Sequence, residues 1–166
     1  DNIVQNLAGS NEPIEPEEAQ AGELPKQLLL NGAGALAQAH DEEHGGFGSA
    51  PKFPPPMMLD YLLAVRATAS AESHPDFART LDKAVETTLT AMATGGIYDQ
   101  FGGGFARYSV DGEWLIPHFE KMLYDNAEIP RVLLEAYRAT GDERYARVAR
   151  ETFDFLDREL GHPEGG

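Results

Sequence analysis

Residues 95–104 read GGIYDQFGGG, and this glycine-rich run separates two stretches that have the residue spacing of helices. Ahead of it, residues 75–93 place apolar side chains on one stripe and charged side chains opposite, which is typical of an amphipathic surface helix. Behind it, a stretch that opens at Pro117 carries apolar residues at helical intervals. Because glycine runs end helices, the segment predicts a helix, a long loop and a second helix.

The same order occurs earlier in the chain, around residues 45–56, which read GGFGSAPKFPPP. Apolar residues recur at helical spacing from Pro25 until this loop, and the run that starts after Pro56 is apolar on almost all sides. A further amphipathic stripe follows Asp142, a residue type that caps helices. Helices with one apolar stripe thus alternate with helices that are apolar on more sides. This alternation is typical of stacked helical hairpins, with one helix outside and one inside.

We therefore predict an all-α fold of stacked helical hairpins in residues 24–166. We expect this part to be truncated at its C-terminus and to follow a disordered linker in residues 1–23. The loops that lead into inner helices lie on one face of such an array, so both glycine-rich loops should share a face. Two local features are also expected. Asp111-Gly112 predicts a small β-hairpin over 105–116, and Pro130 predicts a kink or a lost hydrogen bond near Asn126.

Composition restricts the partners and the chemistry. The chain has 28 Asp and Glu against 13 Lys and Arg, a net charge of -15, whereas a nucleic-acid or anionic-membrane partner would need a basic face. It has no cysteine, which excludes disulfides and thiol chemistry within the chain. No apolar run approaches the ~20 residues that span a bilayer, and no secretory segment opens the chain. His40 and His44 lie among acidic residues, which fits a solvated helix end better than a metal site. We expect a cytoplasmic protein with no metal and no cofactor.

The two glycine-rich loops and their flanks hold most of the groups that could carry chemistry. A helix that opens at Pro117 would bring His118, Lys121 and Asp125 onto one face. Carboxylates and a histidine suit acid and base catalysis on a sugar, while aromatic and cationic side chains suit binding of its ring and hydroxyls. The acid/base candidates are Asp99, His118, Glu120 and Asp125. The substrate-binding candidates are Lys52, Tyr98, Arg107, Tyr108, Trp114 and Lys121.

Each candidate also has a structural interpretation, and the sequence leaves both interpretations open. A histidine at a helix start commonly serves as a hydrogen-bond partner, as His118 could. Lys121 and Asp125 could form a plain ion pair. Asp99 could hold its own turn through its side chain, and Trp114 could pack in the core.

Several motifs resemble those of a known family, namely residues 45–54 (GGFGSAPKFP), 95–100 (GGIYDQ), 102–109 (GGGFARYS) and Trp114 with 117–127 (PHFEKMLYDNA). Over residues 25–166 the chain is similar to the thioredoxin-domain-containing proteins related to spermatogenesis-associated protein 20 and the bacterial YyaL-like proteins. The resemblance implies a thioredoxin-like domain upstream. It also implies a six-hairpin (α/α) toroid similar to N-acylglucosamine 2-epimerases and six-hairpin glycosidases, of which this chain holds the first hairpins. Pro130 stands where a leucine-like residue is usual in the family.

Two functions are compatible with these features. The first is a carbohydrate-active toroid, either a sugar epimerase or isomerase or a glycosidase, with a sugar as ligand and no cofactor. The second is non-catalytic, a binding or scaffold module that supports the upstream thioredoxin-like domain. Convergent carboxylates in an open cleft favour the enzyme, while the same residues in buried ion pairs favour the scaffold.

Overall fold

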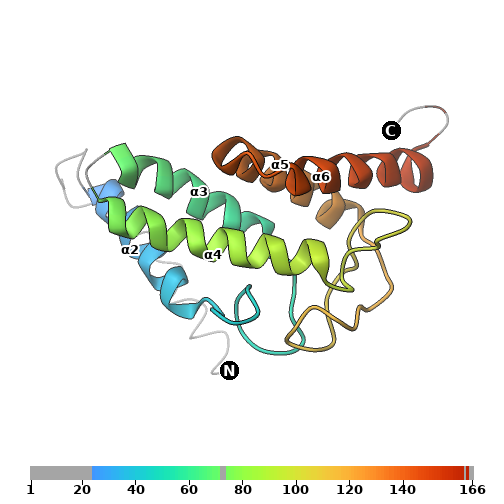
Figure 1. The fold of residues 1–166 in the computed structure, drawn as a ribbon, viewed down its shortest axis with the longest axis horizontal. Helices are drawn as coiled ribbons and strands as arrows, with labels where there is room; N and C mark the ends of the chain where they lie inside the picture. The colour runs from blue at the N-terminus through green and yellow to red at the C-terminus, as the bar shows by residue number, and fades with distance from the viewer. Residues whose placement is uncertain (1–23, 72–73, 163, 165–166) are drawn as a thin grey trace, which may run out of the picture.

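The computed structural model of the protein describes residues 24–71, 74–162 and 164, so the predicted linker in residues 1–23 lies outside the described residues. Helices make up most of the described part (Figure 1). In chain order they are α2 (Leu24–Ala39), α3 (Pro56–Ala71), α4 (Pro75–Thr94), α5 (Leu123–Thr140) and α6 (Glu143–Phe155), which continues into a π-helical turn at Leu156–Leu160. None of the helices in this part of the chain is both long and apolar enough to cross a membrane.

The helices pack as neighbouring pairs, and both long loops lie on the same side of them. α3 packs against α4 and α5, and α5 packs against α6; α3 and α4 run side by side in Figure 1. The loops 40–55 and 95–122 meet where the backbones of Lys52 and Ser109 exchange two N–H···O hydrogen bonds, both 2.8 Å long. The predicted stack of hairpins and the predicted common face of the two loops are therefore confirmed.

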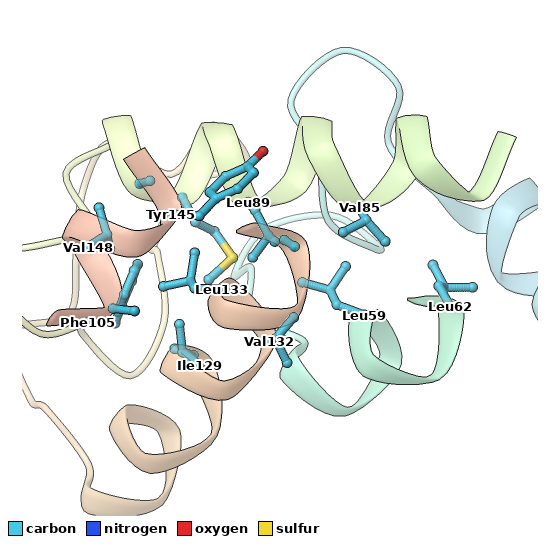
Figure 2. Close-up of a cluster of buried hydrophobic side chains, with 14 of the residues drawn as sticks. Leu59, Leu62, Val85, Leu89, Phe105, Ile129, Val132, Leu133, Tyr145 and Val148 are labelled. Carbon is cyan, nitrogen blue, oxygen red and sulfur yellow. The ribbon is translucent and has the colours of Figure 1, made fainter. Parts of the chain in front are cut away.

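Apolar side chains from α3, α4, α5 and α6 meet in one core (Figure 2). Its buried members include Leu59, Leu62, Val85, Leu89, Ile129, Val132, Leu133, Tyr145 and Val148. Burial of one such aliphatic side chain contributes roughly 1.5–3 kcal/mol, so tertiary packing holds these helices together. A tight turn joins α5 to α6. In it Gly141 has a left-handed φ of 74°, and Asp142 caps α6 by accepting the Arg144 N–H at 2.9 Å, as its sequence position predicted.

The fourth predicted helix begins later than expected. α5 begins at Leu123, whereas the sequence predicted a start at Pro117. Residues 117–120 instead lie beside residues 107–110, because two backbone hydrogen bonds of 2.7 and 2.9 Å join the two segments. The prediction of one shared helical face is therefore wrong for His118, Lys121 and Asp125.

The predicted β-hairpin over 105–116 is not seen. In this stretch the structure has isolated bridges in place of a ladder, from Phe105 to Tyr98, from Ser109 to Lys52 and from Ser109 to Pro117. The backbone groups of Ser109 pair with Lys52 on one side, and Pro117 has no N–H to offer on the other. A side chain holds the intervening turn, because the Asp111 carboxylate accepts backbone N–H groups at 2.5–3.2 Å. These N–H groups belong to Glu113, Leu115 and Ile116.

Pro130 lies inside α5 without ending it. Because proline has no N–H, the Asn126 carbonyl loses its usual helical partner, as predicted. The Asn126 side chain is buried and joins the helix to the loop: its amide exchanges hydrogen bonds with the backbone of Phe105 at 2.6 and 3.0 Å. A kink in α5 at this point stays a prediction.

Gly46→Ala tests how closely the loop 40–55 approaches Trp114. Gly46 has a φ of 78°, and a Cβ there would lie 2.5 Å from the Trp114 ring; Gly48 has a φ of 77° with open space around it. We expect Gly48→Ala to cost about 1–2 kcal/mol of unfolding free energy through backbone strain. Gly46→Ala should cost about 1–3 kcal/mol more through overpacking. Urea unfolding measures the free energy of both variants. Equal losses would contradict the close contact between Gly46 and Trp114.

Candidate functional site

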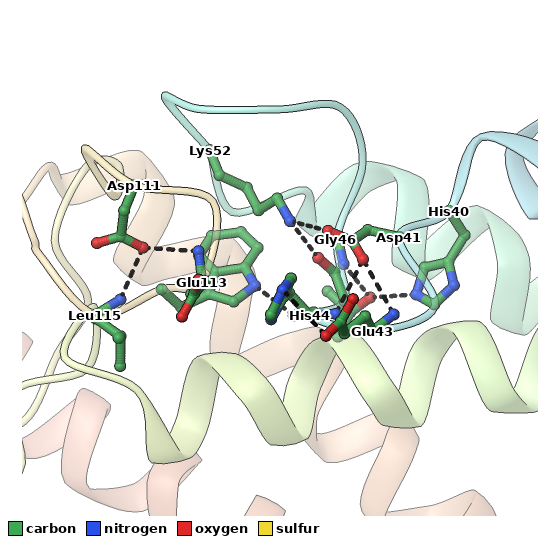
Figure 3. Close-up of polar contacts among 12 residues, drawn as sticks. His40, Asp41, Glu43, His44, Gly46, Lys52, Asp111, Glu113 and Leu115 are labelled. Carbon is green, nitrogen blue, oxygen red and sulfur yellow. Dashed lines mark hydrogen bonds and ion pairs between the residues drawn. The ribbon is translucent and has the colours of Figure 1, made fainter.

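The loop 40–55 is built around a buried ammonium group (Figure 3). The side chain of Lys52 is fully buried, and its Nζ donates to Asp41 Oδ2 at 2.7 Å and to the Gly45 carbonyl at 2.9 Å. The other carboxylate oxygen of Asp41 accepts the N–H groups of Glu43 and His44. Burial alone would raise the pKa of Asp41, but the hydrogen bonds outweigh it and lower the pKa to about 2. The predicted substrate contact of Lys52 is therefore replaced by a structural role.

Trp114 covers the same loop from the other side. It is buried, its indole N–H donates to the His44 carbonyl at 2.9 Å, and its ring centre lies 5.6 Å from the Lys52 ammonium. A cation over an aromatic face is attracted by the partial negative charge that the ring quadrupole places on that face. Because the ring is enclosed, its geometry fits a packing residue and does not offer a stacking platform to a sugar.

Asp99 and Lys121 form a similar arrangement in the loop 95–122. Asp99 Oδ1 accepts the N–H groups of Phe101 and Gly102 at 3.0 and 2.9 Å, and Oδ2 lies 2.8 Å from Lys121 Nζ. The hydrogen bond from Lys121, together with those from the backbone, lowers the pKa of Asp99 to about 2. A carboxylate held in this way stays ionised at neutral pH and holds its turn, which is the structural alternative for Asp99.

Tyr98 is buried as well. Its hydroxyl donates to Glu151 on α6, and its ring packs against Phe105 with the ring centres 4.9 Å apart. Burial and the Glu151 carboxylate raise the pKa of Tyr98, so the phenol stays neutral. Five of the predicted site residues thus serve the loops themselves, namely Lys52, Tyr98, Asp99, Trp114 and Lys121.

The other predicted residues meet at the surface between the two loops, around Arg107. The Arg107 guanidinium lies 4.8 Å from the ring centre of Phe53 and 5.2 Å from that of Tyr124. Its Nη1 lies 3.3 and 3.4 Å from the two carboxylate oxygens of Asp125. Phe53 and Tyr124 are 42% and 48% exposed, so both rings are open to a ligand. We call this group the Arg107 cluster: Phe53, Arg107, Tyr108, His118, Glu120, Tyr124 and Asp125.

Stacked rings form one side of the Arg107 cluster. The Tyr108 ring lies 5.0 Å from that of Phe53 and 4.6 Å from the imidazole of His118, to which it is nearly parallel at 17°. His118 Nδ1 lies 3.9 Å from Glu120 Oε2, and both side chains are half-exposed. The pairing of residues 107–110 with 117–120 brings these side chains together, so the backbone pairing that replaces the predicted helix builds this part of the site.

Asp125 is the buried acid of the Arg107 cluster. It lies in the first turn of α5, and 3% of its surface is exposed. Burial raises the pKa of Asp125, while the Arg107 guanidinium opposes the shift and Glu128 adds to it. A carboxyl group whose pKa is raised by burial exchanges its proton closer to neutral pH than an exposed carboxyl group does. Burial therefore favours the neutral form of the Asp125 carboxyl group, and the Arg107 guanidinium favours the ionised form.

Two members of the cluster, Phe53 and Tyr124, were not among the predicted site residues. Exposed aromatic rings cannot be distinguished from core rings by residue type, because phenylalanine and tyrosine usually pack inside. The clue that the sequence offers to their role is their position in the chain. Phe53 directly follows the buried Lys52, and Tyr124 directly precedes Asp125, so each stands beside a residue that the fold holds in place.

Comparison with known sequences identifies the relatives. Over 131 residues, 79% of this chain, it is 46% identical to spermatogenesis-associated protein 20 of Mus musculus and 44% identical to that of Homo sapiens. The chain is homologous to one segment of spermatogenesis-associated protein 20. It is also 38% identical over 128 residues to an uncharacterized protein of Caenorhabditis elegans. The chain spans 16% of the length of the spermatogenesis-associated proteins. No protein-family model matches the sequence.

Two solved structures of similar fold are sugar epimerases. A sugar epimerase from a ruminal bacterium superposes with a TM-score of 0.65 at 18% sequence identity, over 85% of this chain and 38% of that one. Cellobiose 2-epimerase from Spirochaeta thermophila gives a TM-score of 0.60 at 22% identity, over 86% of this chain and 39% of that one. These epimerases are (α/α) toroids, so the predicted fold class, a portion of such a toroid, is confirmed.

Asp41→Asn tests the buried ion pair through pH. The folded pKa of Asp41, about 2, lies below its ordinary 3.8. Its stabilising contribution is therefore present above pH 3.8 and is lost as the pH falls through about 2. We expect the native chain to lose about 2 kcal/mol of unfolding free energy over this window from Asp41, and Asp41→Asn to lose correspondingly less. Urea unfolding of both proteins at neutral and acid pH measures these losses. If both proteins lost the same unfolding free energy in acid, Asp41 would not be the group responsible.

Arg107→Met tests the charge balance at Asp125. Removing the guanidinium leaves burial and Glu128 to act on Asp125, so its raised pKa should rise further. Arg107→Lys keeps a positive charge and should show a smaller rise. Titration of the Asp125 carboxyl carbon by NMR measures the change. An unchanged pKa in Arg107→Met would show that the two side chains are not electrostatically coupled.

Proposed function

We propose that the Arg107 cluster binds a neutral saccharide and that the chain forms part of an epimerase-like sugar site. The observation that carries the proposal is the buried Asp125 carboxyl group beside a guanidinium that two partly exposed aromatic rings flank. Ligand sites commonly combine aromatic walls with a small number of placed polar groups. Here the rings of Phe53 and Tyr124 would pack on the sugar ring, and the polar groups would bind its hydroxyls. The likeness of the fold to sugar epimerases supports the proposal.

The charges of the cluster favour a neutral sugar over a sugar acid or a sugar phosphate. Arg107 is already paired with Asp125, and Glu120 adds a second carboxylate at the surface. The whole chain carries a net charge of -15. An anionic ligand would have to compete with Asp125 for the guanidinium and approach Glu120 against like-charge repulsion.

Epimerisation fits these groups better than hydrolysis does. At a carbon beside a carbonyl, it requires one group to remove a proton and another to return a proton to the opposite face. We assign these two steps to Asp125 and His118, with Glu120 orienting the imidazole and Arg107 and Tyr108 binding hydroxyls. A glycosidase would need two carboxyl groups on either side of the scissile bond. Glu120, the other carboxylate of the cluster, is exposed and lies beside His118.

The remaining predicted residues favour a second function. Lys52, Asp99 and Lys121 are tied into ion pairs within the loops, and the buried Asp125 carboxylate is paired with Arg107, which is the pattern expected of a scaffold or binding module. In that case the loop face would support an upstream thioredoxin-like domain and would catalyse no reaction. Both proposals include an upstream thioredoxin-like domain, the remaining hairpins of the toroid and a cytoplasmic location.

A ligand titration separates the two functions. We expect glucose or cellobiose to raise the melting temperature of the full chain in a dose-dependent way. Phe53→Ala and Asp125→Asn should abolish the rise. Phe153→Ala is the matched control and should keep it, because Phe153 is an exposed phenylalanine of α6 outside the cluster. The absence of a rise with these sugars, or a rise that survives both cluster variants, would contradict the saccharide site and favour the scaffold.

A further inference from the structure

The two glycine-rich loops contain the same short motif. Residues 40–47 read HDEEHGGF and residues 98–105 read YDQFGGGF, so in both an aspartate is followed four positions later by Gly-Gly-Phe. Each motif comes after one helix and before the next: the first lies between α2 and α3, and the second between α4 and α5. The sequence likeness is short, so the contacts decide whether the two motifs are equivalent.

The backbone hydrogen bonds of the two motifs correspond one to one. The aspartate N–H donates to the carbonyl of the second glycine at 3.0 Å in both loops. The aspartate carbonyl accepts the N–H of the first glycine at 2.8 Å for Asp41 and 2.9 Å for Asp99. One carboxylate oxygen accepts the N–H groups two and three positions further on, at 2.9–3.0 Å. The paired glycines have φ values of 72° and 78° in the first loop and 74° and 81° in the second.

A lysine completes each motif in the same way. Lys52 Nζ lies 2.7 Å from the second carboxylate oxygen of Asp41, and Lys121 Nζ lies 2.8 Å from that of Asp99. Each ammonium also donates to the carbonyl of the first glycine, at 2.9 and 2.8 Å, and each lies over an aromatic ring. We call the aspartate, its Gly-Gly-Phe turn and the lysine a clamp, the first with Asp41 and the second with Asp99.

Each clamp packs against a different helix of the stack. A Cβ on Gly45 would lie 2.7 Å from the backbone of Thr88 on α4, and one on Gly103 would lie 2.3 Å from the Glu151 carbonyl on α6. The first clamp, between α2 and α3, thus meets the helix that follows α3, and the second, between α4 and α5, meets the helix that follows α5. The same relation recurs one hairpin further along the chain, as expected of a repeated unit.

The two copies differ in the distance from the aspartate to the lysine. The lysine follows Asp41 by 11 positions and Asp99 by 22. The additional length in the second copy accommodates the paired segments 107–110 and 117–120, which carry much of the Arg107 cluster. The first copy contributes Phe53 directly after its lysine. The cluster is thus assembled between the two clamps.

We infer that the two clamps are copies of one repeated unit, and that Lys52 and Lys121 are positioning residues of the Arg107 cluster. Lys52 fixes the backbone next to Phe53, and Lys121 fixes the end of the segment 117–120, which carries His118 and Glu120. The contacts define the clamps whatever the ligand, and only the link to a saccharide rests on the proposed function.

Lys121→Met in the full chain tests the positioning role. Its melting temperature should fall, and the NMR resonances of the His118 ring should move toward those of an unstacked imidazole, because segment 117–120 loses its anchor. Lys121→Arg keeps a cation and should retain most of the stacking shift. Lys83→Met is the matched control and should leave the His118 resonances unchanged, because Lys83 forms an exposed ion pair with Glu42 at 2.5 Å.

The first clamp has its own reporter. Trp114 is the single tryptophan of the chain, so Lys52→Met should move the fluorescence emission to longer wavelength as the ring becomes exposed. If Lys52→Met does not fold, the Lys121 variants still test the positioning role. A lower melting temperature in Lys121→Met with unmoved His118 resonances would overturn the positioning role. None of these readouts uses a ligand, so a failure of sugar binding would contradict the proposed function and leave this inference standing.

Discussion

The loop face of this protein depends on two ammonium groups that are held inside its loops. Long connections without regular strands leave backbone N–H and carbonyl groups that must find partners. Asp41 and Asp99 supply acceptors for several N–H groups, and each carboxylate also pairs with a lysine ammonium of its loop. The Lys52 side chain is fully buried, and a buried charge without a partner is strongly destabilising. The aspartate, the glycines and the lysine are therefore interdependent.

This constraint accounts for where the candidate site lies. Once the loops are fixed, the segments 107–110 and 117–120 of the loop 95–122 pair through their backbones, and the side chains of Arg107, Tyr108 and His118 come to the surface together. Asp125 enters the cluster from the start of α5 and Phe53 from the other loop. Helices supply the frame and one acid, while irregular segments supply most of the polar and aromatic groups, as is common in functional sites.

Local patterns predicted the frame well. The stripe of α4, the cap at Asp142 and the glycine-rich loops all follow from short-range rules, so the helical hairpins and the common face of the loops could be predicted. The start of α5 could not, because residues 117–120 pair with a segment about ten positions away, which outweighs a local helical pattern. Lys52 was misassigned for a related reason: residue type places lysine at the surface, and only the Asp41 pair makes its burial possible.

The structure brings some of the predicted site residues together, and their role in a site stays a prediction. His118, Glu120, Asp125, Arg107 and Tyr108 do meet, whereas Asp99 and Lys121 satisfy each other. The most direct test of a saccharide site at the Arg107 cluster is an NMR titration of the full chain with a neutral sugar. The account predicts that the resonances of Phe53, Tyr108, His118 and Tyr124 shift together and saturate with one dissociation constant. Shifts confined to other surfaces, or none at saturating sugar, would contradict it.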